Sequence, residues 1–170
     1  MSLTTNLKTN IYIQSEAEFC RAKKSGFWET LVGRFTRQRP HLLSFSEVIE
    51  PAAHLPARDL GVQDVPLAQL VGSVNRAQNF TRHFRPRHSD HTSKERWRMI
   101  YTLAATGQGF PPVSVFKVGR EYFVKDGHHR ASVARYLGWP SIQAHVTELS
   151  PVELYPVEGA LAWSPGSCAG

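Results

Sequence analysis

The chain has 170 residues, of which 41% are hydrophobic and 20% are charged, and its formal net charge is +6. This length predicts one domain with extensions and supplies enough apolar residues for a buried core. No apolar run approaches the roughly 18 residues of a membrane-spanning helix, so we expect no membrane segment. The positive charge permits polyanionic partners without identifying one.

The cysteines and the N-terminus carry little structural information. Cys20 and Cys168 lie far apart and neither has a second cysteine nearby, which argues against a disulfide framework or a zinc ribbon. The first six residues contain no basic region followed by an apolar stretch, so we expect no signal peptide. A cytoplasmic protein is the expectation that follows.

Two helices are predicted near the N-terminus. Ser15 followed three residues later by Glu18 is typical of a capping box, so we expect a helix to begin there. Gly26 is expected to end or bend this helix. Residues 27–37 predict a second helix, because their apolar residues recur at helical spacing.

The chain divides into three parts by composition. Residues 42–49 are apolar and fit either a strand or a helix, while the Pro, Ala and His content of residues 50–60 indicates a connection. We therefore expect an N-terminal helical extension with its connection at residues 1–60 and a core domain at residues 61–148. The Pro-rich and Gly-rich residues 149–170 predict an irregular tail.

The core domain is predicted to be α+β, a small mixed sheet with packed helices. Strands are expected at residues 61–65, 71–74, 113–118, 121–124 and 141–147, and a helical turn at residues 66–70. Thr92 and Glu95 suggest a capping box that opens an amphipathic helix containing a buried Trp97. Gly119 and Arg120 fit a two-residue hairpin turn.

A strand, a tight turn and a helix around Gly127 form the segment with the clearest functional signal. Gly127 permits a sharp turn, and the first amides of the following helix, at His128, His129 and Arg130, lack intrahelical acceptors. Together with the helix dipole and these three side chains, the amides suit a phosphate or another anion. The alternative is that a glycine simply precedes a helix whose first side chains are solvated. The helix is expected to pack on the sheet through Val133, Ala134 and Leu137 and to end at Gly138.

Asp126 precedes the turn and is a candidate Mg²⁺ ligand. Mg²⁺ bound to nucleotide phosphates needs only one or two carboxylates from the protein. The adjacent residues His128 and His129 face different ways at a helix start, and no His-x-x-x-His pattern or nearby cysteine completes a zinc set. Magnesium with a nucleotide is therefore the expected cofactor, and zinc is not expected.

A basic segment precedes the helix at Thr92. Its arginines are interleaved with Phe80 and Phe84, a pattern that suits a surface neutralising phosphates while stacking on bases. The alternative is a solvated loop docked on the core by its two phenylalanines. We expect a mixture, in which Phe80 and Phe84 pack and some arginines reach an anion. The candidate nucleic-acid contacts are Arg76, Arg82, Arg85 and Arg87.

The segment from Lys125 to Ala134, with the preceding strand at residues 111–115, resembles the ParB/sulfiredoxin superfamily, specifically its uncharacterised ParB-like nuclease domain branch. The similarity covers residues 65–148. The shared element is a Gly-x-x-Arg turn that opens a helix and binds nucleotide phosphates, here matched by Gly127 and Arg130. The run Asp-Gly-His-His-Arg is similar to that of archaeal free-serine kinases, although no glutamate in residues 71–86 matches their catalytic one.

The resemblance implies which residues would act. Phosphate or nucleotide (ATP, ADP or CTP) would be held by Gly127, His128, His129 and Arg130, helped by Arg85 as a basic residue ahead of the helix. Asp126 and His129 would be the catalytic residues, with Asp126 as metal ligand or base. Sulfiredoxins have a catalytic cysteine where His128 stands, which argues against sulfiredoxin activity.

Two functions remain open at this point. The first is a nucleotide-binding domain with phosphoryl-transfer or NTP-hydrolysing activity. The second is a non-catalytic DNA-binding or RNA-binding module that uses the same turn and the basic segment at residues 76–87. A nuclease ranks below both, because no acidic cluster of the two-metal kind surrounds the turn.

Overall fold

The structure is a computed structural model that describes residues 2–35, 41–49, 55–88 and 90–149. Its helices are α1 (Ser2–Phe35), α2 (Phe45–Val48), α3 (His91–Ala105) and α4 (His128–Tyr136), with short 3-10 turns η1 (Leu67–Gln69) and η2 (Ala77–Asn79). Its strands are β1 (Leu43–Ser44), β2 (Ala57–Pro66), β3 (Leu70–Ser73), β4 (Val113–Val118), β5 (Glu121–Asp126) and β6 (Ser141–Leu149).

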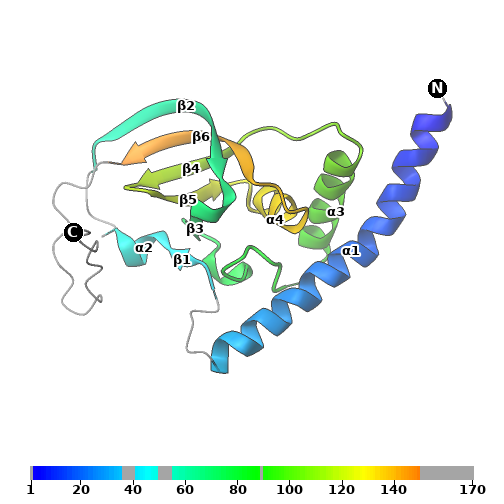
Figure 1. Ribbon diagram of the computed structural model, residues 1–170, viewed down its shortest axis with the longest axis horizontal. Coiled ribbons are helices and arrows are strands. Elements are labelled where there is room, and N and C mark those ends of the chain that lie inside the picture. Colours follow the sequence, from blue (N-terminus) through cyan, green and yellow to red (C-terminus); the bar gives the residue numbers. More distant parts are fainter. Residues whose placement is uncertain (1, 36–40, 50–54, 89, 150–170) are drawn as a thin grey trace, which may run out of the picture.

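The strands form one six-stranded mixed sheet in the order β1-β3-β5-β4-β6-β2 (Figure 1). Strands β4 and β5 are an antiparallel hairpin that closes at the Val118–Glu121 pair. Strand β3 runs parallel to β5, and β6 runs parallel to β4. The predicted α+β class, the mixed sheet and the hairpin turn at Gly119 are confirmed.

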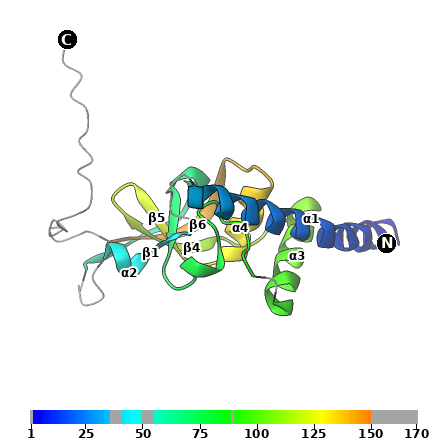
Figure 2. The ribbon, with the colours of Figure 1, turned by 90° about the horizontal axis from the view of Figure 1, so that it is seen from below.

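Helix α4 lies between the sheet and the other long helices, as Figures 1 and 2 show. Its residues Ala131 and Ala134 are buried in the cluster that also holds the sheet residues Val115 and Val124. Val133 instead packs with Phe19 of α1 and Trp97 of α3, and Leu137 packs against that second cluster. The expectation that Val133 and Leu137 face the sheet is therefore wrong, whereas the burial of Ala134 on the sheet and of Trp97 in the core is confirmed.

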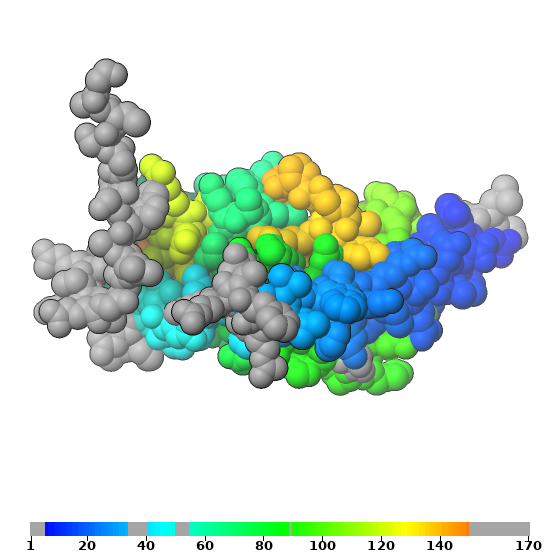
Figure 3. All heavy atoms as spheres, turned by 60° about the horizontal axis from the view of Figure 1, so that its bottom comes forward, coloured from blue at the N-terminus to red at the C-terminus, as the bar shows by residue number. Residues whose placement is uncertain are grey.

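The N-terminal region is one continuous helix rather than two. Ser15 lies inside α1, where its hydroxyl donates to the carbonyl of Tyr12 at 2.5 Å and accepts from Arg98 of α3 at 3.1 Å. Gly26 also lies inside α1. A Cβ there would lie 2.7 Å from the Cβ of Arg85, so the glycine permits this close approach. Both residues serve close contacts of α1 rather than a helix start and a helix break. Figure 3 shows α1 lying along one side of the molecule.

Two further element boundaries differ from the expectation. Strand β2 begins at Ala57, so the expected connection at residues 50–60 is wrong in its last part. Most residues of β2 are solvent-exposed at the sheet edge, so the strand lacks the apolar alternation that would have identified it. Helix α3 is capped by Asp90, whose carboxylate accepts from the amide of Ser93 at 3.0 Å, and not by Thr92.

The structure describes only part of the remaining N-terminal and C-terminal regions for which an expectation was stated. Residues 42–49 contain both a short strand and a short helix, β1 and α2. The expected tail at residues 149–170 begins at the last residue of β6, and residues 150–170 lie outside the described part. Within the described residues, no helix combines the length and the apolar character needed to cross a membrane.

Candidate anion-binding site

The turn between β5 and α4 depends on a glycine. Gly127 is the N-cap of α4 and has a φ of 94°, in the left-handed region that side chains disfavour. A Cβ at this position would lie 2.7 Å from Cγ1 of Val113 and 2.9 Å from Nε of Arg130. The predicted tight turn is therefore present, and both conformation and space restrict it to glycine.

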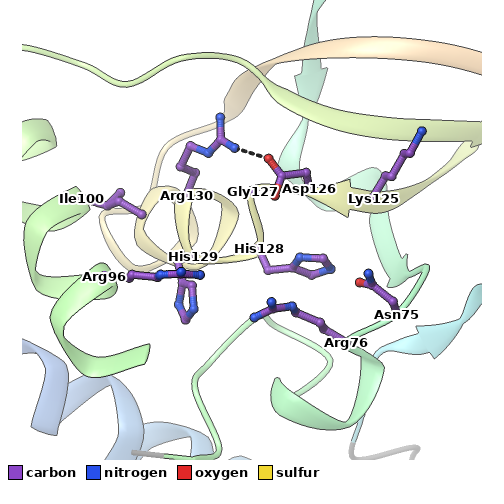
Figure 4. Close-up of a pocket in the computed structure, with 10 residues that line it drawn as sticks. All are labelled: Asn75, Arg76, Arg96, Ile100, Lys125, Asp126, Gly127, His128, His129 and Arg130. Atoms are coloured by element: carbon purple, nitrogen blue, oxygen red, sulfur yellow. Dashed lines mark hydrogen bonds and ion pairs between the residues drawn. The ribbon is translucent and has the colours of Figure 1, made fainter. Parts of the chain in front are cut away.

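Arg130 packs across this turn. Its Nη1 donates to the carbonyl oxygens of Pro111 at 3.0 Å and Pro112 at 2.7 Å, and its Nη2 donates to Oδ2 of Asp126 at 2.7 Å. Figure 4 shows the Arg130 side chain directed toward Asp126, away from His129. These bonds tie the start of α4 to the segment that leads into β4.

A cavity of about 210 Å³ opens at the N-terminal end of α4. The helix bonds begin with the amide of Ala131, which donates to the carbonyl of Gly127 at 3.0 Å, so the amides of residues 128–130 precede the helix ladder. The lining residues, shown in Figure 4, come from the β3–η2 loop, α3, β5 and α4: Asn75, Arg76, Arg96, Ile100, Lys125, Asp126, Gly127, His128, His129 and Arg130.

His128 joins α4 to the end of β3. Its ring is 4% exposed, and a hydrogen bond of 2.7 Å links its Nε2 to Oγ of Ser73, which also accepts from the amide of Arg76 at 2.8 Å. The ring stacks on Phe80 with the planes 16° apart. Burial, with a smaller effect of the Arg76 charge, lowers the pKa of His128 to about 4. His128 is therefore neutral at pH 7, and the Ser73 hydroxyl that it contacts fixes the backbone of Arg76 at the rim of the cavity.

His129 lies between two guanidinium groups. Burial, with smaller effects of the positive charges of Arg76 and Arg96, lowers the pKa of His129 to about 4, while Asp90 acts in the opposite direction. Figure 4 shows Arg96 reaching from α3 toward the His129 ring. Nδ1 of His129 is buried and has no hydrogen-bond partner among the described residues. A polar atom in this situation is a feature of ligand sites as well as of strained interiors.

Two basic residues of the cavity, Arg96 and Lys125, were not among the predicted ligands. Arg96 is exposed on α3 and Lys125 is exposed at the end of β5. The ammonium of Lys125 lies 5.1 Å from the centre of the Phe116 ring. No local pattern distinguishes Arg96 from a solvated helix residue, because its role depends on how α3 packs against α4.

The four arginines predicted for nucleic-acid binding lie in different places. Arg76 lines the cavity at α4, Arg82 lines a second cavity beside β1 and β3, and Arg87 lines a third beside α1. Arg85 is half-buried over the ring of Tyr136, near Gly26 of α1, and does not line the cavity at α4. Burial lowers the pKa of Arg85 despite the nearby carboxylate of Glu29. Phe80 and Phe84 are 2% and 0% exposed, as expected of packing residues.

Asp126 is the acid of the cavity. Its side chain is 75% exposed and forms the ion pair with Arg130. Within the described part of the chain, no group of three or more His, Cys, Asp or Glu side chains is arranged to hold a metal ion. Asp126 alone could therefore serve as the protein ligand of a Mg²⁺ that takes its other ligands from phosphates and water.

Comparisons with known proteins include a similarity to a solved structure. No protein-family model and no curated protein sequence matches the chain. The crystal structure of sulfiredoxin from Arabidopsis thaliana is similar to it with a TM-score of 0.39 and 17% sequence identity, over 52% of this chain and 86% of that chain. No functional conclusion follows from this similarity.

Proposed function

We propose that this protein binds the phosphate group of a nucleotide, or of another phosphate-bearing small molecule, at the N-terminus of α4. The observation that carries the proposal is the convergence of two kinds of donor on one cavity. The first-turn amides of α4 and the guanidinium groups of Arg76, from the β3–η2 loop, and Arg96, from α3, come from separate elements around it. Lys125 adds positive charge at the edge of the cavity, although its ammonium lies over the Phe116 ring. Asp126 is the acid among the described residues that line the cavity, and it is ion-paired with Arg130.

The expected affinity is modest for phosphate alone. A helix N-terminus contributes about 0.3–1 kcal/mol to a bound anion, and a hydrogen bond from a charged donor about 1.5–3 kcal/mol. Ordering Arg76 and Arg96 at the rim of the cavity subtracts from these contributions. A net binding free energy of about 4 kcal/mol corresponds to a Kd of about 1 mM. Tighter binding requires that a larger ligand makes contacts beyond the phosphate.

The size of the cavity favours a ligand that enters only in part. A volume of about 210 Å³ is smaller than the roughly 300–1,000 Å³ of sites that enclose a drug-sized molecule. A nucleotide such as ATP, ADP or CTP would place its phosphates in the cavity and its base outside. Mg²⁺ would be held by Asp126 together with the phosphate oxygens, and would neutralise their negative charge.

A catalytic extension of the proposal assigns phosphoryl transfer or hydrolysis to the same site. His129 is neutral at pH 7 and has an Nδ1 without a partner among the described residues, so in the tautomer protonated at Nδ1 it would donate one hydrogen bond to a phosphate oxygen. Asp126 would hold the metal ion or accept a proton from the attacking group. Loss of phosphate release in His129→Asn, with nucleotide binding retained, is the expected result of a turnover assay.

Thermal-shift titration tests the binding proposal. The ligands are ATP, ADP, CTP, GTP, inorganic phosphate and a short DNA duplex, each with and without Mg²⁺. A ligand at 100 times its Kd adds about 2.7 kcal/mol, which is several degrees for a chain of this size. The test variant combines Arg76→Gln with Arg96→Gln. The control is Arg120→Gln in the exposed β4–β5 turn, which removes one positive charge away from the cavity.

The proposal predicts stabilisation by at least one nucleotide, which the double variant loses and Arg120→Gln retains. Stabilisation by the duplex alone, fading with salt at a log–log slope of about −0.9 per phosphate contacted, would instead support the nucleic-acid module. The distribution of Arg76, Arg82 and Arg87 over three cavities does not favour that alternative.

A further inference from the structure

We propose that a second cavity, between the β1–β3 edge of the sheet and the end of α4, binds a small organic carboxylate with a short apolar body. The cavity has a volume of about 270 Å³ and shares no lining residue with the cavity at the start of α4. Its basic lining residues include Arg82, Arg135 and His41, and its apolar ones include Leu43, Leu70 and Val71. The inference is independent of the proposed phosphate site.

Arg135 is the principal ligand. Its Nη2 donates to the carbonyl oxygens of Leu70, at 2.9 Å, and of Leu67, which fixes the guanidinium in place. Its Nε is buried and has no hydrogen-bond partner among the described residues. With Nη2 occupied by two carbonyls, Nε is a buried N–H for which the described residues supply no acceptor, and an anion would supply one.

His41 supplies a second unpartnered polar atom. Its Nδ1 is buried and, within the described part of the chain, makes no hydrogen bond. Burial and the charge of Arg87 lower the pKa of His41, so the ring is neutral at pH 7. Unsatisfied polar atoms are uncommon in folded proteins, and two of them on residues lining one cavity indicate a ligand that pairs with both.

The charge of the cavity favours an anion. Among the described residues that line it, none is an acid. Glu29, which acts on Arg135 from nearby, already accepts from Thr81 Oγ1 at 2.9 Å and contacts His83 Nδ1 at 2.7 Å. Burial and the charges of Arg85 and Arg82 lower the pKa of Arg135, so a bound anion would relieve both the repulsion and the unpaired Nε.

The apolar wall selects the class of anion. Leu43, Leu70 and Val71 line the cavity, and Leu70 is fully buried. Burying apolar ligand surface against them stabilises the complex in proportion to the area removed from water. A carboxylate attached to a few carbons satisfies the guanidinium and fills the apolar side, whereas inorganic phosphate would leave that side in contact with water.

The test is a titration with pentanoate, followed by NMR at the Nε–H of Arg135, which gives its own proton–nitrogen resonance. The comparison ligands are 1-pentanol, which has the same apolar body without charge, and inorganic phosphate. The variants are His41→Phe, which removes the polar atom and keeps a ring, and Arg135→Lys, which keeps the charge and removes Nε. Arg120→Lys is the control.

The expected result is a saturable shift of the Arg135 Nε–H with pentanoate, which binds at least about tenfold more tightly than pentanol or phosphate. The loss of one charge-assisted hydrogen bond should weaken binding about tenfold in Arg135→Lys, and His41→Phe should weaken it by a smaller factor. Arg120→Lys should bind as the natural protein does. An Nε–H that does not move with pentanoate, or that moves equally with pentanol or more with phosphate, would overturn the proposal. If Arg135→Lys does not fold, the titrations of the natural protein and of His41→Phe still test the proposal.

Discussion

Nε of Arg130 would lie 2.9 Å from a Cβ at residue 127, so the arginine packs directly over Gly127. The two residues that carry the resemblance to Gly-x-x-Arg turns are therefore in contact with each other. Arg130 makes hydrogen bonds to Pro111, Pro112 and Asp126, which position the first amides of α4. In the proposed anion site, the motif would position the backbone amides, and Arg76 and Arg96 would supply positive charge.

Gly127→Ala is expected to destabilise the protein by about 2–5 kcal/mol, from the left-handed conformation and the overpacked Cβ together. Its Cβ would meet Val113 at 2.7 Å as well as Arg130. Gly138→Ala is the matched control, because that glycine has a φ of +74° with nothing within 4 Å of the added Cβ. Urea unfolding should show a smaller loss in the control. Equal losses would contradict the packing role of Gly127.

Arg130 and Arg76 are expected to differ in what their removal changes. Arg130→Gln leaves the carbonyls of Pro111 and Pro112 without their donor and should lower the free energy of unfolding by about 1–3 kcal/mol. Arg76→Gln should leave stability nearly unchanged and weaken phosphate binding about tenfold. Unfolding curves and phosphate titrations on both variants check this. A loss of affinity only in Arg130→Gln would contradict the assignment.

Much of this turn follows from sequence, because its determinants are local. The hairpin, the glycine at the start of α4 and the helix that follows are fixed by residues adjacent in the chain. Gly26 and Ser15 contact Arg85 and Arg98, which are more than 50 residues away in the chain. Rules that use only neighbouring residues therefore wrongly identify the two residues as helix boundaries. The same reason explains why Arg96 was missed.

Ser73 is predicted to stabilise the site through His128. Ser73→Ala would leave Nε2 of a buried histidine and the amide of Arg76 without their shared partner, at a cost of about 1–3 kcal/mol. Ser73→Thr retains the hydroxyl and tests whether the added methyl group is tolerated. The measurement is the free energy of unfolding, with the His128 ring shifts as a local probe. Unchanged stability in Ser73→Ala would contradict the role of this hydrogen bond.

Stability is expected to fall as the pH is lowered from 7 toward 4. The pKa values of His128 and His129 are about 4 in the folded protein, below the ordinary value of 6.5. The unfolded chain therefore binds more protons than the native one between pH 6.5 and 4, and unfolding becomes more favourable there. Each histidine contributes up to about 3 kcal/mol to the free energy of unfolding. This contribution is present above pH 6.5 and is lost as the pH falls to 4. Urea unfolding at several pH values should show a shallower dependence in His129→Asn. An unchanged pH dependence in that variant would contradict the lowered pKa.

The most direct test of the phosphate site is a proton–nitrogen NMR titration of the backbone amides with inorganic phosphate at constant ionic strength. The account predicts saturable shifts at His128, His129 and Arg130, with a Kd on the order of 1 mM. These shifts should be largely lost in Arg76→Gln with Arg96→Gln and kept in Arg120→Gln. Amides of residues 128–130 that do not move while the rest of the spectrum responds would contradict phosphate binding at the start of α4.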